Sequence, residues 1–285
     1  MPIGNWLRYK IDLKGRTESG QGYLYSGEDP LLTRSVTVKK IVGNLQSAER
    51  EAALMASYGQ NHFLPQVFDF FVFGEDGYIV TDALPVEPVG DDPVQGKRRE
   101  LSKAIRITQN VLRGLRHLHE KGILHACLEP RHVLLADDRS STVKISGFSC
   151  AVRKRVQGYY KGPEPGGRWE YMAPEQFVPT EQYLAPRQLM GEVQLDDRAD
   201  LYSAAALCYY LLTGQAPFSS SEAAYSETAT FYGDVLRRHE QGQMGEWKGV
   251  PEDLKMILIK AMHPDRDQRP ANAGEFLNLL RPYEK

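Results

Sequence analysis

The sequence predicts an α+β protein of two lobes, in which a β-rich N-terminal lobe with one helix precedes a mainly helical C-terminal lobe. Runs rich in β-branched and aromatic residues, bounded by glycine, fill the first third of the chain. After about residue 200 the apolar residues instead recur at helical spacing. Because the strands come first and most helices follow, the two types of element should form separate layers.

The N-terminal lobe is expected over residues 1–84. The segments GYLYSG and RSVTVKKIVG are typical of strands, since β-branched and aromatic residues lie between glycines. NLQSAEREAALMASYG predicts one helix with a polar start and Gly59 as its end. LPQVFDFFVFGEDGYIVTDAL predicts a hairpin with Glu75-Asp76-Gly77 at the turn.

Residues 85–98 are expected to form a connector, because they are rich in proline, glycine and aspartate. The C-terminal lobe should then occupy residues 99–285. It begins with a helix from about Arg99 to Glu120, which Gly122 ends. HVLLA and TVKIS predict short strands, and DLYSAAALCYYLLTG predicts a buried helix because it is apolar almost all round. PEDLKMILIKAM and NAGEFLNLLRPY predict amphipathic helices.

Composition indicates an ordinary globular protein. Of the 285 residues, 41% are hydrophobic and 25% charged, and the net charge of -2 gives no global attraction for nucleic acid or an anionic membrane. The three cysteines are widely spaced, which favours reduced thiols in the cytoplasm. We expect no secretory signal and no membrane span. The sequence specifies neither an oligomeric state nor the identity of a protein partner.

Six motifs follow one another in a fixed order: VTVKKI, HACLEPRHVLL, VKISGFSCA, YMAPEQ, DLYSAAALCYYLLTGQAPF and HPDRDQRP. Together they resemble the signature series of the protein kinase family, over roughly residues 9–281. The helical part is most similar to bacterial Ser/Thr kinases of the eukaryotic type. The resemblance implies a bilobal kinase-like fold with a nucleotide cleft between its lobes.

Two residues of this cleft follow from the first motif. Strand alternation places Thr37 and Lys39 on one face and Lys40 on the other. The resemblance implies that Lys39 is the ATP-binding lysine and that it pairs with a glutamate on the next helix. Glu51 is the expected partner, because Met55 and Tyr58 continue the same helix face.

The segment TESGQGYLY occupies the place of the kinase glycine-rich loop. Thr17 and Ser19 stand where the first two glycines would be, and Gly22 matches the third. A side chain at these places restricts the backbone that would approach phosphate. The segment therefore fits an ordinary hairpin turn as well as a phosphate-binding loop.

The resemblance also implies that the positions of kinase chemistry hold unusual residues. In HACLEPRH, Cys127 stands in the place of the catalytic base, His132 in that of a Mg²⁺-binding asparagine, and Glu129 in that of a lysine near the transferred phosphate. Gly147 stands in the place of the metal-binding aspartate. From these four positions we expect a pseudokinase that is not an enzyme and that holds no metal.

The nucleotide pocket implied by the resemblance has Leu24, Val80 and Leu134 around the adenine. Thr81 is expected behind the base and Asp82–Leu84 at the hinge, while Thr37 narrows the slot. Without Mg²⁺ the triphosphate charge would be poorly neutralised, and Glu129 would add repulsion. We expect no cofactor, or at most weak binding of ATP without Mg²⁺.

Other motifs imply structural roles. By the resemblance, Glu175 of MAPE pairs with Arg269, Asp200 anchors the backbone of the catalytic loop, and His125 packs into the core.

Two patterns leave alternatives open. His125, Cys127 and His132 could form a metal site or a Cys–His dyad, or they could point in different directions. The basic segment from about Ser149 to Glu175, and the apolar residues in the stretch after it, fit either a partner surface or ordinary surface and packing roles. These apolar residues are Tyr183, Leu184, Leu189 and Met190.

From these observations the sequence favours a protein-interaction scaffold or an allosteric regulator in signalling. Two alternatives remain, namely a nucleotide sensor whose lobes close on its ligand and a kinase-fold enzyme with non-standard transfer chemistry. Turnover of labelled ATP would distinguish the enzyme, and specific nucleotide binding would distinguish the sensor.

Overall fold

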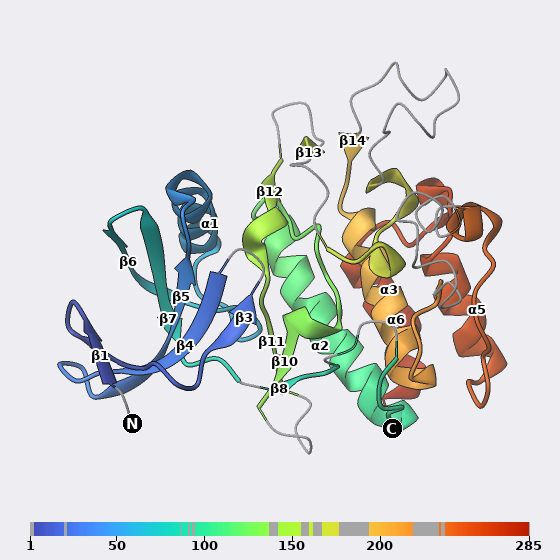
Figure 1. Cartoon of the computed structure of the whole chain (residues 1–285). Helices are drawn as coiled ribbons and strands as arrows, with labels where there is room; N and C mark the ends of the chain where they lie inside the picture. Colours follow the sequence, from blue (N-terminus) through green and yellow to red (C-terminus); the bar gives the residue numbers. More distant parts are fainter. Residues whose placement is uncertain are drawn as a thin grey trace.

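The computed structural model describes residues 3–19, 22–85, 87–90, 92, 95–136, 142–154, 160–161, 167–176, 194–218, 234 and 237–284. Its N-terminal part is a β-sheet with one helix, and its C-terminal part is mainly helical (Figure 1). The predicted α+β class and the bilobal arrangement are confirmed. Tyr183, Leu184, Leu189 and Met190, together with much of the basic segment before them, lie outside the described residues.

The N-terminal sheet is antiparallel and has the strand order β1-β2-β4-β5-β7-β6, with β3 paired to β4. Its strands are β1 (Ile3–Trp6), β2 (Tyr9–Asp12), β3 (Thr17–Ser19), β4 (Gly22–Asp29), β5 (Arg34–Ile41), β6 (Val67–Phe73) and β7 (Asp76–Asp82). The β6–β7 turn falls at Gly74 and Glu75, so it begins one residue before the predicted turn and shares Glu75 with it. Gly74 has a φ of 63°, which suits the tight turn.

Helix α1 (Leu45–Tyr58) covers one face of this sheet. It begins where the Asn44 side chain accepts a hydrogen bond from the Ser47 amide at 3.0 Å, and it ends at Gly59 with a φ of 75°. The helix approaches β7 closely, because a Cβ placed on Gly77 would lie 2.3 Å from that of Ala48. The sequence prediction for this helix is confirmed.

The opposite face of the sheet has its own apolar cluster. Alternation along β5 separates the two faces, so that Val36 and Val38 belong to this cluster while Thr37 and Lys39 face the other way. The members of the cluster are Tyr9, Ile11, Tyr25, Val36, Val38, Tyr78 and Val80.

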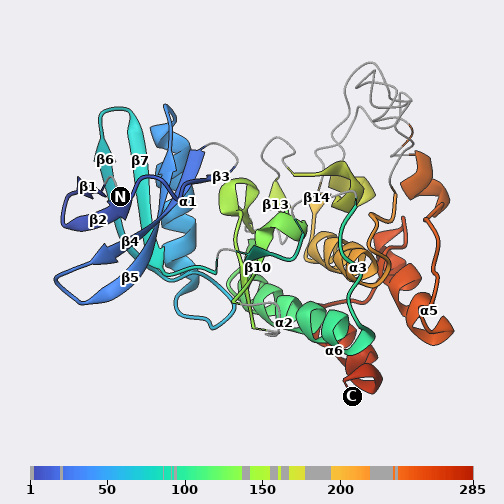
Figure 2. The same ribbon diagram turned by 60° about the horizontal axis from the view of Figure 1, so that its bottom comes forward.

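The C-terminal part is built around helices α2 (Leu101–Glu120) and α3 (Arg198–Thr213), which pack against each other. Every residue of α3 from Ala199 to Leu212 is buried, as the apolar sequence predicts. Figure 2 shows α6 beside α2. The other described helices are α5 (Glu252–Ala261), α6 (Ala273–Leu280), η1 (Pro130–His132), η2 (Phe148–Cys150), η3 (Trp169–Tyr171), η4 (Pro174–Gln176), η6 (Arg266–Gln268) and η7 (Arg281–Tyr283).

Short strand pairs lie between the sheet and these helices. Strand β10 pairs with both β8 and β11, β12 pairs with β9, and β13 pairs with β14. Their bounds are β8 (Glu87–Pro88), β9 (Ile123–Leu124), β10 (Val133–Leu135), β11 (Val143–Ile145), β12 (Val152–Arg153), β13 (Tyr160–Lys161) and β14 (Gln194–Leu195).

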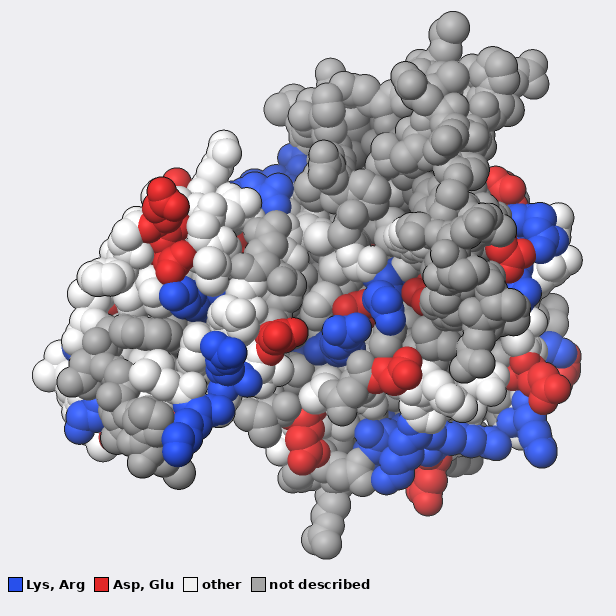
Figure 3. Space-filling model, in the orientation of Figure 1, with Lys and Arg blue, Asp and Glu red and all other residues white. Residues whose placement is uncertain are grey.

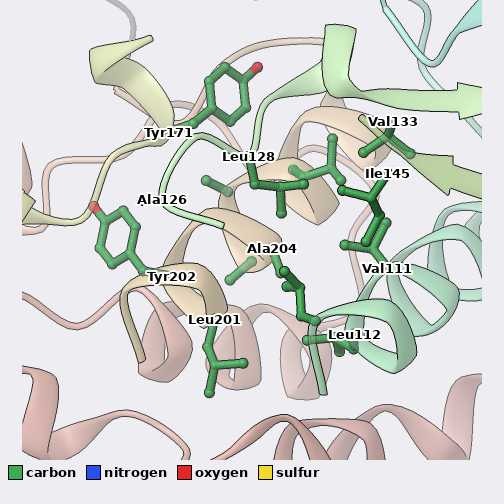
Figure 4. Packing of buried hydrophobic residues seen from close by; sticks show 14 of the residues in the cluster. Val111, Leu112, Ala126, Leu128, Val133, Ile145, Tyr171, Leu201, Tyr202 and Ala204 are labelled. Atoms are coloured by element: carbon green, nitrogen blue, oxygen red, sulfur yellow. The ribbon is translucent and has the colours of Figure 1, made fainter. Parts of the chain in front are cut away.

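One hydrophobic core runs from α1 through α2 and α3 to α6. Figure 4 shows how the loop after β9 joins it, with Ala126 and Leu128 lying among side chains of α2 and α3. On the face drawn in Figure 3, acidic and basic side chains are interspersed. No helix within the described ranges is both long enough and apolar enough to span a bilayer.

Candidate functional site

A cavity of about 690 Å³ lies between the sheet and the loops that follow α2. A smaller cavity continues inward from it and shares Leu24, Thr37 and Leu84 with its lining. We call the two together the cleft. It brings together all six residues predicted for a nucleotide pocket, namely Leu24, Thr37, Lys39, Glu51, Thr81 and Leu134.

Lys39 and Glu51 form an ion pair at the inner end of the cleft. The Lys39 Nζ lies 2.7 Å from Oε1 and 2.8 Å from Oε2 of Glu51. Only 12% of the Lys39 side chain and 3% of the Glu51 side chain are exposed. Lys40, on the other face of β5, pairs with Asp76 at 2.8 Å instead. Because a buried charge without its partner costs about 3–5 kcal/mol, each member of the Lys39–Glu51 pair fixes the other.

The outer part of the cleft differs from the predicted adenine pocket at one residue. Val80 is fully buried in the cluster on the far face of the sheet. Ile79, which lies opposite Lys39 in the strand register, lines the cleft instead. The prediction for Val80 is wrong, since neighbours in a strand face opposite sides and Thr81 already faced the cleft.

Thr37 forms a hydrogen bond in addition to narrowing the slot expected for the adenine. Its hydroxyl accepts a hydrogen bond from the Leu84 backbone amide at 2.9 Å. Both residues line the cleft, and Leu84 is the last residue of the predicted hinge. A ligand that needs the Leu84 N–H must therefore first displace the Thr37 hydroxyl.

The loop that carries Cys127 and His132 is held by Asp200 at the start of α3. The Asp200 carboxylate accepts hydrogen bonds from the backbone amides of His125 and Ala126, at 2.9 and 2.8 Å, and contacts His119 Nε2 at 2.8 Å. Ala126 has a φ of 61°, which is unusual for a residue with a side chain. Its carbonyl accepts a hydrogen bond from Gln176 Nε2 at 2.9 Å. These contacts fix the loop backbone independently of the side chains that face the cleft.

His125 is fully buried, and its Nε2 lies 2.9 Å from the Ser146 carbonyl oxygen. Burial lowers its pKa to about 4, so that the ring is neutral near pH 7. It does not converge with Cys127 and His132 on one point. Within the described ranges, no group of three or more His, Cys, Asp or Glu side chains is arranged to hold a metal ion.

His132 and Gly147 lie against each other. The His132 Nδ1 donates a hydrogen bond to the Cys127 carbonyl oxygen at 2.6 Å, and burial lowers the pKa of the ring. A Cβ built on Gly147 would lie only 2.4 Å from Cγ of His132, and Gly147 has a φ of 84°. The imidazole thus takes the space that an aspartate at position 147 would need.

The protein kinase resemblance implies Mg²⁺ ligands at these same two positions. Mg²⁺ prefers oxygen ligands in octahedral geometry. His132 offers a nitrogen that lies beside Gly147, and Gly147 offers no side chain. The described residues at these two positions do not fit Mg²⁺ in the ordinary kinase arrangement.

Glu129 places a carboxylate on the wall of the cleft. The residue is 6% exposed, and its Oε1 lies 3.7 Å from His132 Nε2. Its Oε2 is buried and has no hydrogen-bond partner among the described residues. An unpaired buried carboxylate oxygen is costly, and it is a strong acceptor for a proton or a cation.

The segment after the cleft is fixed at its far end by a second ion pair. Arg269 Nη1 and Nη2 lie 2.6 and 2.8 Å from the two carboxylate oxygens of Glu175, in a bidentate pair. The Arg269 side chain is fully buried. The pairing of Glu175 with Arg269 and the anchoring role of Asp200 are both found as the sequence predicts.

Comparison with known proteins identifies the family of the chain. Residues 30–279 match the family model described as the protein kinase domain. The chain belongs to the protein kinase family.

The relatives of this kinase-family chain include a probable serine/threonine-protein kinase of Streptomyces coelicolor, 29% identical over 90% of the chain and 37% of that protein. The serine/threonine-protein kinase pkn2 of Myxococcus xanthus is 26% identical over 96% of the chain and 32% of that protein. The probable serine/threonine-protein kinase PknB of Bifidobacterium longum is 28% identical over 97% of the chain and 39% of that protein. The chain therefore spans between about a third and two fifths of these relatives.

These comparisons overturn one expectation. The family match and the names of the relatives point to an enzyme, so the expectation that this kinase-family chain is not one is wrong. The expectation rested on Cys127, Glu129, His132 and Gly147, with Glu129 taken as a repelling charge. In the structure, Oε1 of Glu129 lies near His132, and its Oε2 is a buried acceptor without a hydrogen-bond partner among the described residues.

Sequence reasoning also missed two contacts in the cleft. The hydrogen bond from Leu84 to Thr37 joins residues 47 positions apart. Because its donor is a backbone amide, no pattern of side chains in the sequence predicts it. The interaction of Cys127 with Cys150 joins a loop to the end of the short helix η2, so no regular period predicts it. The position of Cys150 three residues after Gly147 was the available signal for this second contact.

Proposed function

We propose that this chain is a kinase-fold enzyme with non-standard phosphoryl-transfer chemistry, acting from a nucleoside triphosphate to a hydroxyl of a protein partner. The observation that carries the proposal is the buried Lys39–Glu51 ion pair at the inner end of an open cleft. Glu51 holds the Lys39 ammonium at one point, which suits contact with phosphate oxygens. The names of the relatives support this class of reaction.

Glu129 is the candidate acceptor for the proton of the reacting hydroxyl. Cys127 is a poor base, because interaction with Cys150 and burial raise the pKa of its thiol. Glu129 instead offers a buried oxygen without a hydrogen-bond partner. In the proposed step, the oxygen of the reacting protein hydroxyl bonds to the terminal phosphorus of the nucleotide, and the bond from that phosphorus to the bridging oxygen breaks. The nucleoside diphosphate then leaves, and the hydroxyl proton passes to Glu129.

Positive side chains would balance the phosphate charge in this proposal. Arg131 and Arg168 line the same cleft as Lys39. In the proposal these three cations take over part of the neutralisation that ordinary kinases obtain from metal ions. All three cysteines are free thiols, which supports our placing the protein in the reducing cytoplasm.

The test compares two neighbouring lysines. Lys39→Met should abolish transfer of labelled phosphate from ATP, because the fixed cation of the cleft is lost. Lys40→Met is the matched control, since Lys40 lies on the same strand but faces away from the cleft. Glu129→Gln should lower the rate about 10²–10⁴-fold if its carboxylate takes the proton. Circular dichroism establishes that each variant is folded.

Transfer is measured to the chain itself and to mixed protein acceptors, with EDTA, Mg²⁺ or Mn²⁺ present. Label transfer that Lys39→Met leaves unchanged would contradict the proposal. If the wild type binds ATP but transfers no label under any of these conditions, the enzyme proposal is overturned and the chain is a nucleotide sensor.

A further inference from the structure

Two cysteines from different segments of the chain line the same wall of the cleft. Cys127 belongs to the loop anchored by Asp200, and Cys150 ends η2, just after Gly147. Both residues line the cavity of about 690 Å³. Cys127 is enclosed on another side, because a Cβ on Gly167 would lie 2.9 Å from its Sγ. The proposed phosphoryl transfer uses neither of these thiols.

The two thiols differ in exposure and acidity. Cys150 is partly exposed, whereas Cys127 is 6% exposed. Both line one cavity, and each is the largest influence on the pKa of the other. A hydrogen bond from Cys127 lowers the pKa of Cys150 to about 7, and the Ser149 hydroxyl, 3.8 Å from its Sγ, acts in the same direction. Cys127 keeps its proton, because the same interaction and burial raise its pKa.

This asymmetry is that of an attacking and a resolving cysteine. A partly exposed thiolate reacts with oxidants, and a neighbouring thiol then captures the oxidised sulfur. Cys208 provides the contrast within the same chain. It is fully buried in α3, and burial raises its pKa to about 12.

We propose that Cys127 and Cys150 form a reversible oxidation site inside the cleft, at which hydrogen peroxide converts the two thiols into a disulfide. The Cys150 thiolate attacks one peroxide oxygen, the O–O bond breaks, and hydroxide leaves with a proton as water. The resulting sulfenic acid is attacked by the Cys127 sulfur, which loses its proton as the S–S bond forms and a second water leaves. An external dithiol restores both thiols by exchange.

The disulfide would tie the loop of Glu129 and His132 to the segment that follows Gly147. Both segments contribute to the same cavity wall. The crosslink therefore holds together the two segments that form the wall of the cleft around Glu129. The modification rests on the thiols alone and is measured without reference to phosphoryl transfer.

The experiment treats the purified chain with hydrogen peroxide at pH 7.5, blocks the remaining thiols, and digests it with trypsin without reduction. Residues 122–131 should appear joined to residues 145–153, with the loss of two hydrogens, and dithiothreitol should separate them. Cys208→Ser should crosslink as the wild type does. In Cys127→Ser, Cys150 should stop at the sulfenic acid, which dimedone traps.

A second measurement follows alkylation of Cys150 by iodoacetamide against pH. The wild-type midpoint should lie near pH 7, and Cys127→Ser should move it upward, because the weaker interaction with serine no longer stabilises the thiolate. Peroxide that leaves both thiols unreacted, or that oxidises Cys150 without any linked peptide in the wild type, would overturn the proposal. Formation of a disulfide that includes Cys208, at the same rate as the Cys127–Cys150 disulfide, would also overturn the proposal.

Discussion

At the scale of single residues, the Thr37 hydroxyl accepts the hydrogen bond of the backbone amide of Leu84, a residue that lines the cleft. Any ligand that binds through this amide competes with a hydrogen bond already present. Such a bond contributes about 0.5–1.5 kcal/mol net. The apparent affinity of the cleft for a nucleotide is therefore set partly by a side chain that would not itself need to contact the nucleotide.

Thr37→Val tests this competition, since it removes the hydroxyl and keeps the volume of the side chain. We expect the variant to bind ATP about 2–10-fold more tightly if the adenine uses the Leu84 N–H, which corresponds to the energy of one hydrogen bond. Thr37→Ser keeps the hydroxyl and should bind as the wild type does. Isothermal titration or a fluorescent ATP analogue measures the affinities. Weaker binding by Thr37→Val would exclude this use of Leu84.

At the scale of elements, the β10–β11 pair brings η1 and η2 face to face. His132 ends η1, Gly147 precedes η2, and the imidazole packs on the glycine. Each residue makes room for the other. An aspartate at position 147 alone would therefore clash with His132 and would have an unfavourable φ.

Gly147→Asp should destabilise the chain by about 2–4 kcal/mol, from a positive φ and from overpacking against His132. Gly74→Asp is the matched control, because Gly74 also has a positive φ but has no atom within 4 Å of an added Cβ. His132→Asn should recover much of the loss in the double variant. Urea unfolding of the four chains of the cycle measures the coupling. Additive effects of the two substitutions would contradict the fit between these residues.

The elements also show which parts of the site could be predicted. Strand period 2 placed Lys39 toward the cleft, and helix period placed Glu51 opposite it, so the ion pair followed from two regular patterns. Cys150 ends the short helix η2 and Leu84 lies after β7, so neither strand period nor α-helix period predicts where these residues point. The same alternation, along β7, excludes Val80 from the cleft, so the wrong expectation for Val80 was avoidable from the sequence.

At the scale of the whole molecule, a core shared by α1, α2, α3 and α6 buries several titratable side chains. His125 and His239 are both fully buried, and burial lowers their pKa values to about 4 and about 3. An unfolded histidine has a pKa near about 6.5. Between these values the unfolded chain binds more protons than the folded one, so acid favours unfolding.

We therefore expect the free energy of unfolding to fall as the pH drops from 6.5 to 4.5. The slope should approach about 1.4 kcal/mol per pH unit for each of the two histidines. His132, whose pKa burial also lowers, adds to this trend, whereas Glu170, whose pKa burial raises, opposes it. Asp200, whose pKa is lowered, adds to the trend only at more acidic pH. Urea unfolding across this range measures the slope, with His62→Gln as an exposed control. A flat profile between pH 6.5 and 4.5 would contradict the prediction.

The anchoring of the cleft loop by Asp200 has a consequence for synthesis on the ribosome. His125 and Ala126 emerge first, but their backbone amides receive their acceptor only with Asp200, about 75 residues later. The ion pair of Glu175 can form only later still, because its partner Arg269 lies 94 residues further along the chain. The sheet and α1 are complete long before either event, since both end by Asp82. The half that holds Lys39 is therefore synthesised, and available to fold, before the residues that fix the opposite wall of the cleft exist.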